Sequence, residues 1–235
     1  MTTARDAGAG GRLLSRRQAL AYLATSGVLT IASARPTTDA APACVVVPHQ
    51  TEGPFFVDEQ LERSDIRSDP ASGVMRPGTP LALTFVVSQL ASNRCAPIAG
   101  AQVDVWHCDA AGDYSGTGEM PAQAFLRGYQ RTDESGAARF VTLYPGWYFG
   151  RTVHIHFKVR TREGRFGARE FTSQLYFDDT LTDRVHADAP YGGRSGRRLR
   201  NREDGLFRRG GEQLMPPLRK SASGYATTFA VALAA

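Results

Sequence analysis

The sequence lacks three features that would each point to a familiar class of protein. Beyond the first 47 residues no stretch sustains helical periodicity for more than a few turns. No Gly-x-Gly-x-x-Gly fingerprint occurs, so nothing indicates a nicotinamide or flavin cofactor. The apolar stretch at 19–34 contains Thr25, Ser26 and Gly27, and it is too short and too polar to span a membrane. These absences argue against a mainly helical protein, a dinucleotide-dependent enzyme and a membrane-spanning protein.

The sequence also has little net charge once the location of its basic residues is considered. The 235 residues include 28 basic and 23 acidic side chains, a net charge of +5. Four arginines and one acid lie in residues 1–34, which leaves only +2 for the remainder. An arginine run from Arg194 to Arg202 is rich in Gly and Ser, a composition typical of a solvated loop. We therefore predict one globular domain with a sizeable core and no nucleic-acid partner.

The first 34 residues have the order of an export signal. Arg16-Arg17 begins a twin-arginine pattern, the apolar stretch follows, and Ala32-Ser33-Ala34 supplies a small-x-small cleavage pattern. We predict a signal segment at 1–34, a Pro/Ala-rich linker at 35–47 and a globular domain at 48–235. The mature protein would then be periplasmic or extracellular and free of the membrane. A disordered tail with one short helix is the alternative.

Cysteine is scarce, with three residues in the chain. An oxidising compartment suits three cysteines only if two of them pair. Cys44 and Cys95 lie in loop-like sequence, whereas Cys108 lies within a strand pattern. The arrangement we favour is a Cys44–Cys95 disulfide with Cys108 buried. Lipid attachment at Cys44 is a weaker alternative, because no Leu precedes it at the expected place.

Short runs rich in Val, Phe, Thr and Ile recur along the domain, separated by Gly, Pro, Asp and Asn. Such a pattern predicts an all-β fold, an antiparallel β-sandwich with few short helices and long loops around a site. The sequence 132–136 is a hairpin-type turn. The predicted strands are Leu81–Leu90, Gln102–Cys108, Ala137–Leu143, Thr152–Arg160, Glu170–Phe177 and Tyr225–Leu233.

Two histidines two residues apart, His154 and His156, are the first candidates for chemistry. Side chains alternate along a strand, so these two imidazoles project to the same side, roughly 7 Å apart along the chain. Two imidazoles at that spacing can share one metal ion. A lone His-x-His pair is a weak signal, but Tyr148 and Tyr114 occur nearby in turn-like contexts and strengthen it.

Four ordered motifs carry a resemblance to a known family. They are the sequence 51–56 with 63–66, the sequence 103–116 around Tyr114, the sequence 145–156 around Tyr148, and the sequence 173–177. From about residue 48 onward the chain resembles the intradiol ring-cleaving dioxygenases, the catechol and protocatechuate dioxygenases. The resemblance implies the β-sandwich core, an iron centre, and catechol-type substrates that react with O2. It covers no N-terminal helical dimerisation segment, and it leaves a homo-oligomer open.

The resemblance implies that Tyr114, Tyr148, His154 and His156 hold the metal. Phenolate oxygen is anionic and hard, so two tyrosinates favour Fe(3+) over zinc or ferrous iron. A chelating catechol would displace Tyr148, whose phenolate then accepts a proton, and the ring would open between its two hydroxyl-bearing carbons. The substrate supplies all the electrons, and both atoms of O2 enter a muconate-type product.

Alignment by motif implies catalytic roles for Arg151 and Gln174, placing them beside the substrate ring and the oxygen that adds to it. A guanidinium there would stabilise developing negative charge. Arg151 could instead be a solvent-facing loop residue, and Gln174 a satisfied polar residue inside the sheet. We expect Trp147 to be a pocket wall, and the segment 51–54 to fold over the site as a lid.

Other histidines give weaker signals. His107 is expected to point away from Trp106 and to be packed or hydrogen-bonded, and His49 and His186 have no metal-ligand spacing. Two other classes of protein stay open. One is a non-catalytic, transthyretin-like binding sandwich. The other is a zinc-dependent hydrolase that uses the histidine pair with a carboxylate.

Overall fold

The computed structural model describes residues 44–92, 94–162, 168–192 and 198–234, all within one unit that spans 40–235. The predicted signal segment 1–34, most of the linker and the arginines at 194 and 197 lie outside the described residues. In the described part, no helix is long and apolar enough to cross a membrane.

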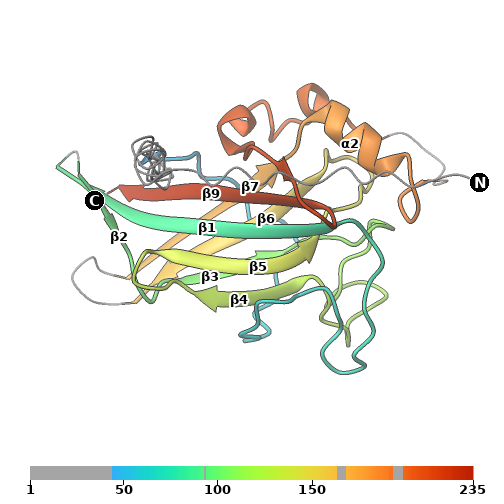
Figure 1. Cartoon of the computed structure of the whole chain (residues 1–235), viewed down its shortest axis with the longest axis horizontal. Helices are drawn as coiled ribbons and strands as arrows, with labels where there is room; N and C mark the ends of the chain where they lie inside the picture. Colours follow the sequence, from blue (N-terminus) through green and yellow to red (C-terminus); the bar gives the residue numbers. More distant parts are fainter. Residues whose placement is uncertain (1–43, 93, 163–167, 193–197, 235) are drawn as a thin grey trace, which may run out of the picture. The chain divides into compact units, whose positions relative to one another are not determined.

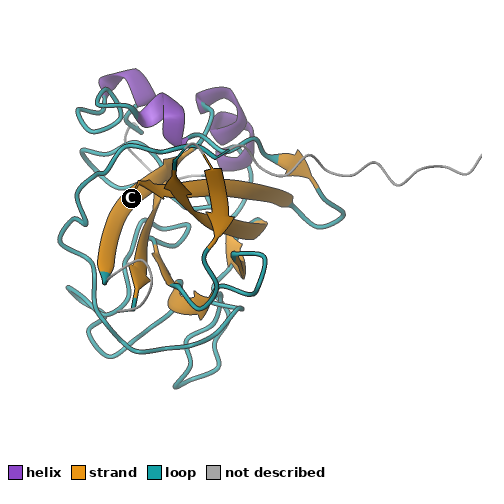
Figure 2. Ribbon diagram, turned by 90° about the vertical axis from the view of Figure 1, so that its left-hand side faces the viewer, coloured by secondary structure: helices purple, strands orange, loops and turns teal. Residues whose placement is uncertain are grey.

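Two β-sheets form the domain, as the strand pattern predicts, and they lie face to face in Figure 1 and Figure 2. One sheet has five strands in the order β2-β1-β9-β8, with β5 also paired to β1. The other has four strands in the order β4-β3-β6-β7. The first consists of β1 Pro80–Ala91, β2 Arg94–Pro97, β5 Ala137–Leu143, β8 Arg219–Lys220 and β9 Tyr225–Ala234, and the second of β3 Gln102–Trp106, β4 Arg127–Arg131, β6 His154–Thr161 and β7 Arg169–Tyr176.

One strand pair departs from the antiparallel arrangement. β1 and β9 run parallel, with Leu81 opposite Tyr225, whereas the other strand pairs of the described part are antiparallel. Parallel neighbours cannot be joined by a short hairpin, so the four-stranded sheet lies between these two strands in the sequence. On its other edge β1 pairs first with β5 and then with β2.

The hydrophobic core lies between the sheets. β1 alternates, with Leu83 and Phe85 buried and facing the core. β6 contributes Ile155 and Phe157 to the same core, and the rings of Phe85 and Phe157 are 4.9 Å apart. Each such side chain stabilises the fold by about 1.5–3 kcal/mol on burial. These inward residues fix which residues of β6 face the opposite side.

The opposite side of β6 is covered as well. All residues from His154 to Val159 are buried, so the outward-facing His154, His156 and Lys158 are shielded from solvent. Loops and the segment 51–60 provide that cover. A strand buried on both faces, with polar residues on one of them, is the feature that positions the site.

The six predicted strands correspond to β1, β3, β5, β6, β7 and β9, and the all-β sandwich is confirmed. Three strands were missed. β2 is fully exposed, β8 has two residues, and β4 has only one large apolar side chain, Tyr129. The helix α2, Asp179–His186, begins after Asp178, whose carboxylate accepts the Leu181 N–H at 2.8 Å. Two short 3-10 turns, Asn201–Glu203 and Gly211–Leu214, follow it.

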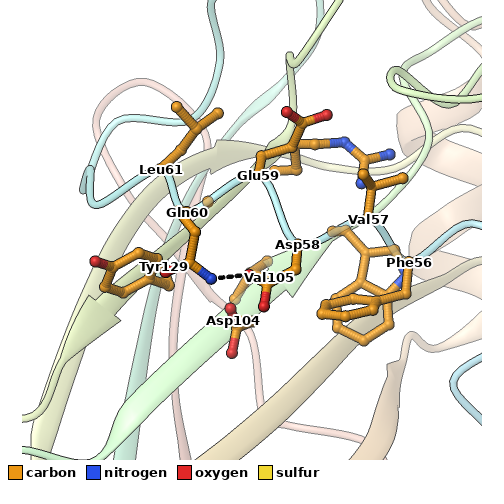
Figure 3. A pocket seen from close by; sticks show the side chains of 12 residues that line it. Phe56, Val57, Asp58, Glu59, Gln60, Leu61, Asp104, Val105 and Tyr129 are labelled. Carbon is orange, nitrogen blue, oxygen red and sulfur yellow. Dashed lines mark hydrogen bonds between the residues drawn. The ribbon is translucent and has the colours of Figure 1, made fainter. Parts of the chain in front are cut away.

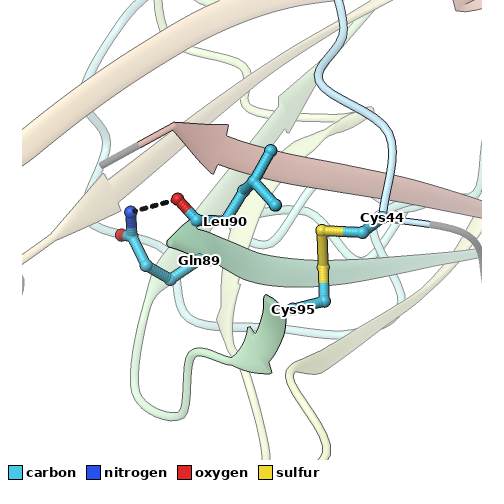
Figure 4. The surroundings of a disulfide bond; sticks show 4 residues. All are labelled: Cys44, Gln89, Leu90 and Cys95. Atoms are coloured by element: carbon cyan, nitrogen blue, oxygen red, sulfur yellow. Dashed lines mark hydrogen bonds between the residues drawn. A yellow bond between two sulfur atoms is a disulfide. The ribbon is translucent and has the colours of Figure 1, made fainter. Parts of the chain in front are cut away.

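The predicted disulfide is confirmed. Cys44 pairs with Cys95 of β2, with Cα atoms 5.8 Å apart, and Figure 4 shows the bond beside β1. Cys108 is buried and is not part of a disulfide. The pairing also removes the lipid alternative, since Cys44 then has no thiol to modify. Residues 44–47, assigned above to the linker, already contact the sandwich: Val45 accepts the Ala232 N–H at 2.9 Å and Val47 is buried.

Candidate metal centre

The two histidines of β6 meet at their ring nitrogens. The Nε2 atoms of His154 and His156 are 3.1 Å apart, and the two residues are 2% and 1% exposed. Between them Ile155 points into the core. The strand periodicity therefore places both imidazoles on one side, as the sequence predicts.

The tautomer of His154 is set by the backbone. Its Nδ1 lies 2.6 Å from the carbonyl oxygen of Thr152, and a carbonyl can only accept, so Nδ1 carries the proton. The lone pair of Nε2 is then free to bind a metal or to accept a proton. His156 stacks on Trp106 with ring centroids 5.0 Å apart and planes 7° apart, and its buried Nδ1 has no hydrogen-bond partner.

Both predicted tyrosines lie against this pair. The hydroxyl of Tyr148 is 3.2 Å from Nε2 of His154. The rings of Tyr114 and Tyr148 are 5.6 Å apart, and that of Tyr114 is 6.4 Å from His156. The hydroxyl of Tyr114 is buried and has no hydrogen-bond partner. The structure therefore brings the four predicted ligands together from a loop, a turn and one strand.

Burial sets the protonation states of the cluster. It lowers the pKa of His154 and His156 well below the usual value near 6.5, and the charge of Arg151 adds to this. Burial also raises the pKa of Tyr114 well above its usual value, and raises the pKa of Tyr148. At neutral pH the imidazoles are neutral ligands, and the phenols lose their protons only if a cation offsets the charge.

The donor set fits a trivalent metal ion. A buried hydroxyl without a partner costs about 1–3 kcal/mol, and a metal bound at Tyr114 would remove that cost. Two phenolates and two neutral imidazoles are the hard, electron-rich set that suits Fe(3+). Among the described residues, no group of three or more His, Cys, Asp or Glu side chains is arranged to hold a metal ion.

Arg151 is fixed beside the same ring nitrogen. Its Nε donates to Oδ2 of the buried Asp204 at 2.8 Å, and its Nη2 donates to Oε1 of Gln174 at 2.6 Å. Its Nη1 lies 3.4 Å from Nε2 of His154. Burial opposes the charge of Arg151, but Asp204 outweighs it and the pKa of Arg151 is raised. The guanidinium therefore stays charged at the edge of the cluster.

Gln174 joins the ligand strand to the segment that covers it. It pairs with His156 in the β6–β7 register and is fully buried. Its Oε1 accepts from Arg151 and, at 3.2 Å, from the Tyr176 hydroxyl, while its Nε2 donates to the carbonyl of Thr51 at 3.0 Å. The amide is satisfied at both ends, and its orientation is thereby fixed.

The strap, defined as residues 51–60, includes the predicted lid segment 51–54 and crosses the ligands. Gly53 has φ +72°, and a Cβ at that position would lie 3.2 Å from Cε1 of His156, so a side chain would be both strained and crowded. Phe55 stacks on Tyr114, with ring centroids 4.2 Å apart, and meets Tyr148 edge-on at 5.8 Å. The strap thus packs directly on three of the four predicted ligands.

An open pocket of about 220 Å³ adjoins the two tyrosines. Phe55, Met120, Tyr114 and Tyr148 line it together with the loop 112–119. Trp147, the predicted wall, packs instead against the main core and does not line this pocket.

The remaining histidines lie outside the cluster, as predicted. The Nδ1 of His107 lies 2.8 Å from the carbonyl of Cys108, and its Nε2 lies 2.6 Å from Oγ1 of Thr142. His49 packs edge-on against Phe171, and His186 stacks on Tyr191.

Sequence reasoning missed four residues of the centre. Asp204 and Tyr176 hold Arg151 and Gln174. No local pattern marks Asp204, whereas Tyr176 lies in the motif 173–177, which by itself assigns it no role. Phe55 and Lys158 were also missed, although Lys158 follows His154 and His156 at the same two-residue spacing and could have been found from it.

Fold and cluster together define a β-sandwich protein with a buried His/Tyr centre, and comparison with known proteins agrees. The family model described as Dioxygenase matches residues 51–189, more than half of the chain. An intradiol ring-cleavage dioxygenase from Tetranychus urticae is 31% identical with a TM-score of 0.69, over 80% of this chain and 94% of that chain. The chain belongs to the intradiol ring-cleaving dioxygenase family.

Two further relatives show how far the likeness extends. The dioxygenase domain of a carbohydrate-binding fusion protein from Streptomyces sp. SirexAA-E is 29% identical with a TM-score of 0.58, over 80% of this chain and 98% of that chain. Chlorocatechol 1,2-dioxygenase from Pseudomonas putida is 32% identical over 99 residues, which are 34% of this chain and 36% of that protein. The matched part thus spans about a third of the length of that curated relative.

Proposed function

We propose that the protein is an exported, iron-dependent intradiol dioxygenase acting on catechol-type diols. The observation that carries the proposal is the convergence of two phenol oxygens and two imidazole nitrogens in one buried cluster. A transthyretin-like binding sandwich would not require a buried tyrosine hydroxyl without a partner. Membership of the intradiol ring-cleaving dioxygenase family supports the same proposal.

Tyr114, Tyr148, His154 and His156 would hold the ion. Ferric iron bound there would draw electron density from a coordinated diol and make its ring reactive toward O2, so that both oxygen atoms enter a muconate-type product. Two phenolates would offset much of the +3 charge, which matters where the ligand side chains are largely buried.

Tyr148 is suited to accept a proton from the substrate. It is half-buried and lies at the pocket, whereas Tyr114 is 6% exposed. Burial raises the pKa of Tyr148, so its phenolate would be a competent base for a proton of the diol. The neighbouring Nε2 of His154 carries no proton, because the Thr152 carbonyl holds the proton on Nδ1. This nitrogen therefore stays a neutral metal ligand.

Arg151 would stabilise the negative charge that develops on the diol oxygens and on the added oxygen. Its ion pair with Asp204 and its bond to Gln174 hold the guanidinium in place before the substrate arrives, which is the arrangement that makes a charged donor effective. The pocket beside Tyr114 and Tyr148 would receive the diol ring, with Phe55 and Met120 as apolar walls.

The proposed location rests on two features. The twin arginines and small-x-small pattern are typical of a signal that carries folded proteins. The Cys44–Cys95 disulfide is typical of a protein that works in an oxidising compartment. Changing Arg16 and Arg17 to lysine should leave the protein in the cytoplasm of an expressing bacterium. Export of that variant at the normal level would contradict the proposed route.

Colour and oxygen uptake test the activity. Purified protein reconstituted with Fe(3+) should be burgundy, because tyrosinate bound to ferric iron absorbs visible light, and protein loaded with zinc should be colourless. Anaerobic addition of catechol should change the visible spectrum, and admitting O2 should consume one O2 per diol. Iron-loaded protein that stays colourless and takes up no oxygen would refute the proposal in favour of a binding sandwich. Hydrolysis by the zinc form alone would favour the hydrolase.

A further inference from the structure

The strap is held to the metal centre by side chains rather than by regular backbone pairing. Residues 51–60 form no strand or helix. Gly53 lies against His156 and Phe55 lies on Tyr114. Phe56 meets Trp106 at 4.8 Å, and Trp106 in turn stacks on His156. Whatever fastens the strap therefore also fixes the rings of two predicted ligands.

Lys158 is the best placed fastener. It lies two residues after His156 on the same covered face of β6, and its side chain is only 6% exposed. Its ammonium pairs with Glu52 of the strap and, at 2.9 Å, with Glu170 of β7. The same ammonium lies 4.0 Å from the centroid of the Phe56 ring, a favourable cation–π distance. One buried cation thus holds the strap by its second and its sixth residue.

The choice of lysine suits this position. The chain has two lysines among 28 basic residues, so arginine is its usual cation. An ammonium offers its donors from one compact nitrogen, whereas a guanidinium spreads them over a larger planar fork. The next outward residue, Arg160, pairs with Asp58 at 2.8 Å and with Asp104 at 2.7 Å. Figure 3 shows these two carboxylates side by side where the strap crosses β3.

The charge of Lys158 is secure. Burial opposes it, but the hydrogen-bonded carboxylates of Glu52 and Glu170 outweigh burial and raise the pKa of the ammonium. The lysine therefore stays charged at neutral pH.

We propose that Lys158 is a positioning residue of the metal centre, which acts by holding Glu52 and Phe56 and so fixing the rings of His156 and Tyr114. This inference rests on the proposed function, because it assigns the strap a role in retaining iron and in shaping the substrate pocket. Loosening the strap opens the side of His156 that Gly53 covers and removes Phe55 from the pocket wall. Iron should then be lost faster and KM for catechol should rise, with a smaller effect on kcat.

The two carboxylate partners of Lys158 supply a matched pair of variants. Glu52→Gln removes the partner on the strap, and Glu170→Gln removes the partner on β7. Each leaves Lys158 with one carboxylate, and both carboxylates are partly exposed, at 39% and 56%. The difference between the variants therefore reports on the strap rather than on the lysine. Lys158→Met, and Lys158→Arg as the conservative replacement, complete the set.

The measurements are hydrogen exchange of the strap amides in iron-free protein, the half-time of iron removal by a hydroxamate chelator, and KM and kcat with catechol. Glu52→Gln should speed strap exchange and iron removal about threefold to tenfold, the range for one ion pair to a buried partner. Glu170→Gln should stay within about twofold of the wild type. Lys158→Met should speed strap exchange and iron removal more than Glu52→Gln does. Lys158→Arg should bring both rates part of the way back to those of the wild type. The melting temperatures of all variants should be similar.

Equal behaviour of Glu52→Gln and Glu170→Gln, in exchange and in iron removal, would overturn the positioning role and leave the proposed function standing. Wild-type protein that binds no iron would overturn both the positioning role of Lys158 and the proposed function. Faster strap exchange together with an unchanged rate of iron removal would also overturn the inference, since the strap would then not control the centre.

Discussion

The two sheets of the sandwich use their outer faces differently. In the five-stranded sheet, β1 and β5 alternate, with Leu81 and Leu83 buried and Ala82 and Val141 exposed. In the four-stranded sheet, β6 is buried on both faces from His154 to Val159. The first sheet supplies core and a solvent-facing surface, whereas the second supplies core on one face and the candidate centre on the other.

The comparison shows where a protein of this size can place buried polar groups. A polar side chain on the exposed face of β1 costs nothing to solvate, but it cannot exclude water from a reaction. On β6 every outward polar residue must find a partner, and His154 and Lys158 find theirs in the backbone, in Arg151 and in the carboxylates of Glu52 and Glu170. Nδ1 of His156 on β6 and the nearby Tyr114 hydroxyl are exceptions, and both belong to predicted metal ligands.

The largest effect is expected when a predicted metal ligand is removed from the four-stranded sheet. His154→Ala should abolish bound iron and the visible band together, because Nε2 of His154 is a neutral donor with its lone pair directed at the cluster. Metal analysis and the visible spectrum measure this. His49→Ala, an exposed histidine beside Phe171, is the control and should keep both. Stoichiometric iron in the His154→Ala protein would show that the ligand assignment is wrong.

The converse experiment alters the five-stranded sheet alone. Replacing Cys44 and Cys95 with serine removes a link across 51 residues. In the loop-entropy model this lowers the free energy of unfolding by about 4 kcal/mol. Urea denaturation with and without reductant measures the loss, and the iron content of the folded protein should not change. Equal stability of the variant and the oxidised wild type would contradict the expected contribution.

A third prediction concerns the link between the sheets. His107, just after β3, bonds Thr142 of β5, and burial lowers the pKa of His107 to about 4. From pH 6.5 down to about 4 the unfolded chain takes up a proton that the folded chain refuses, so stability falls as pH falls. For this residue the loss is about 3 kcal/mol over the window. The urea midpoint should depend less steeply on pH in His107→Gln than in the wild type. An equal dependence in the two proteins would contradict the prediction.

The smallest expected effect separates charge placement from metal binding. Arg151→Ala should keep its iron but lose about a hundredfold or more in turnover, the usual result of removing one fixed donor. Arg151→Lys should recover part, because a point charge does not reproduce the guanidinium fork. Oxygen uptake with catechol measures this, beside thermal melting, since Asp204 would lose its buried partner. The exposed Arg139→Ala on β5 is the control, and normal turnover in Arg151→Ala would make Arg151 an ordinary loop residue.

The sequence predicted the parts of this arrangement that depend on local periodicity. Alternation along β1 and β6 is visible in the sequence, and it placed His154 and His156 on one side. β4 was missed because Arg-Gly-Tyr-Gln-Arg carries no alternating apolar pattern, and its place in the sheet depends on pairing with β3. The roles of Tyr114 and Tyr148 required the family resemblance, since a tyrosine in a loop has many uses.

Contacts between residues far apart in sequence could not be predicted. Asp204 reaches Arg151 across 53 residues, and nothing in its own neighbourhood marks it as a partner. The contact of Gly53 with His156 joins residues about a hundred positions apart, and it depends on the path of a strap without regular structure. Such contacts follow from packing of the whole domain, which a single sequence specifies only through the fold.

The parallel pairing of β1 with β9 has a consequence for how the chain acquires its shape. The central strand of the five-stranded sheet cannot gain its second neighbour until residues from Tyr225 onward have left the ribosome. Pairing strands that are so far apart in the sequence costs chain entropy before any contact between them stabilises the fold, so such pairs form slowly. We therefore expect the five-stranded sheet to be completed late in folding, with one side of β1 unpaired in the nascent chain until then.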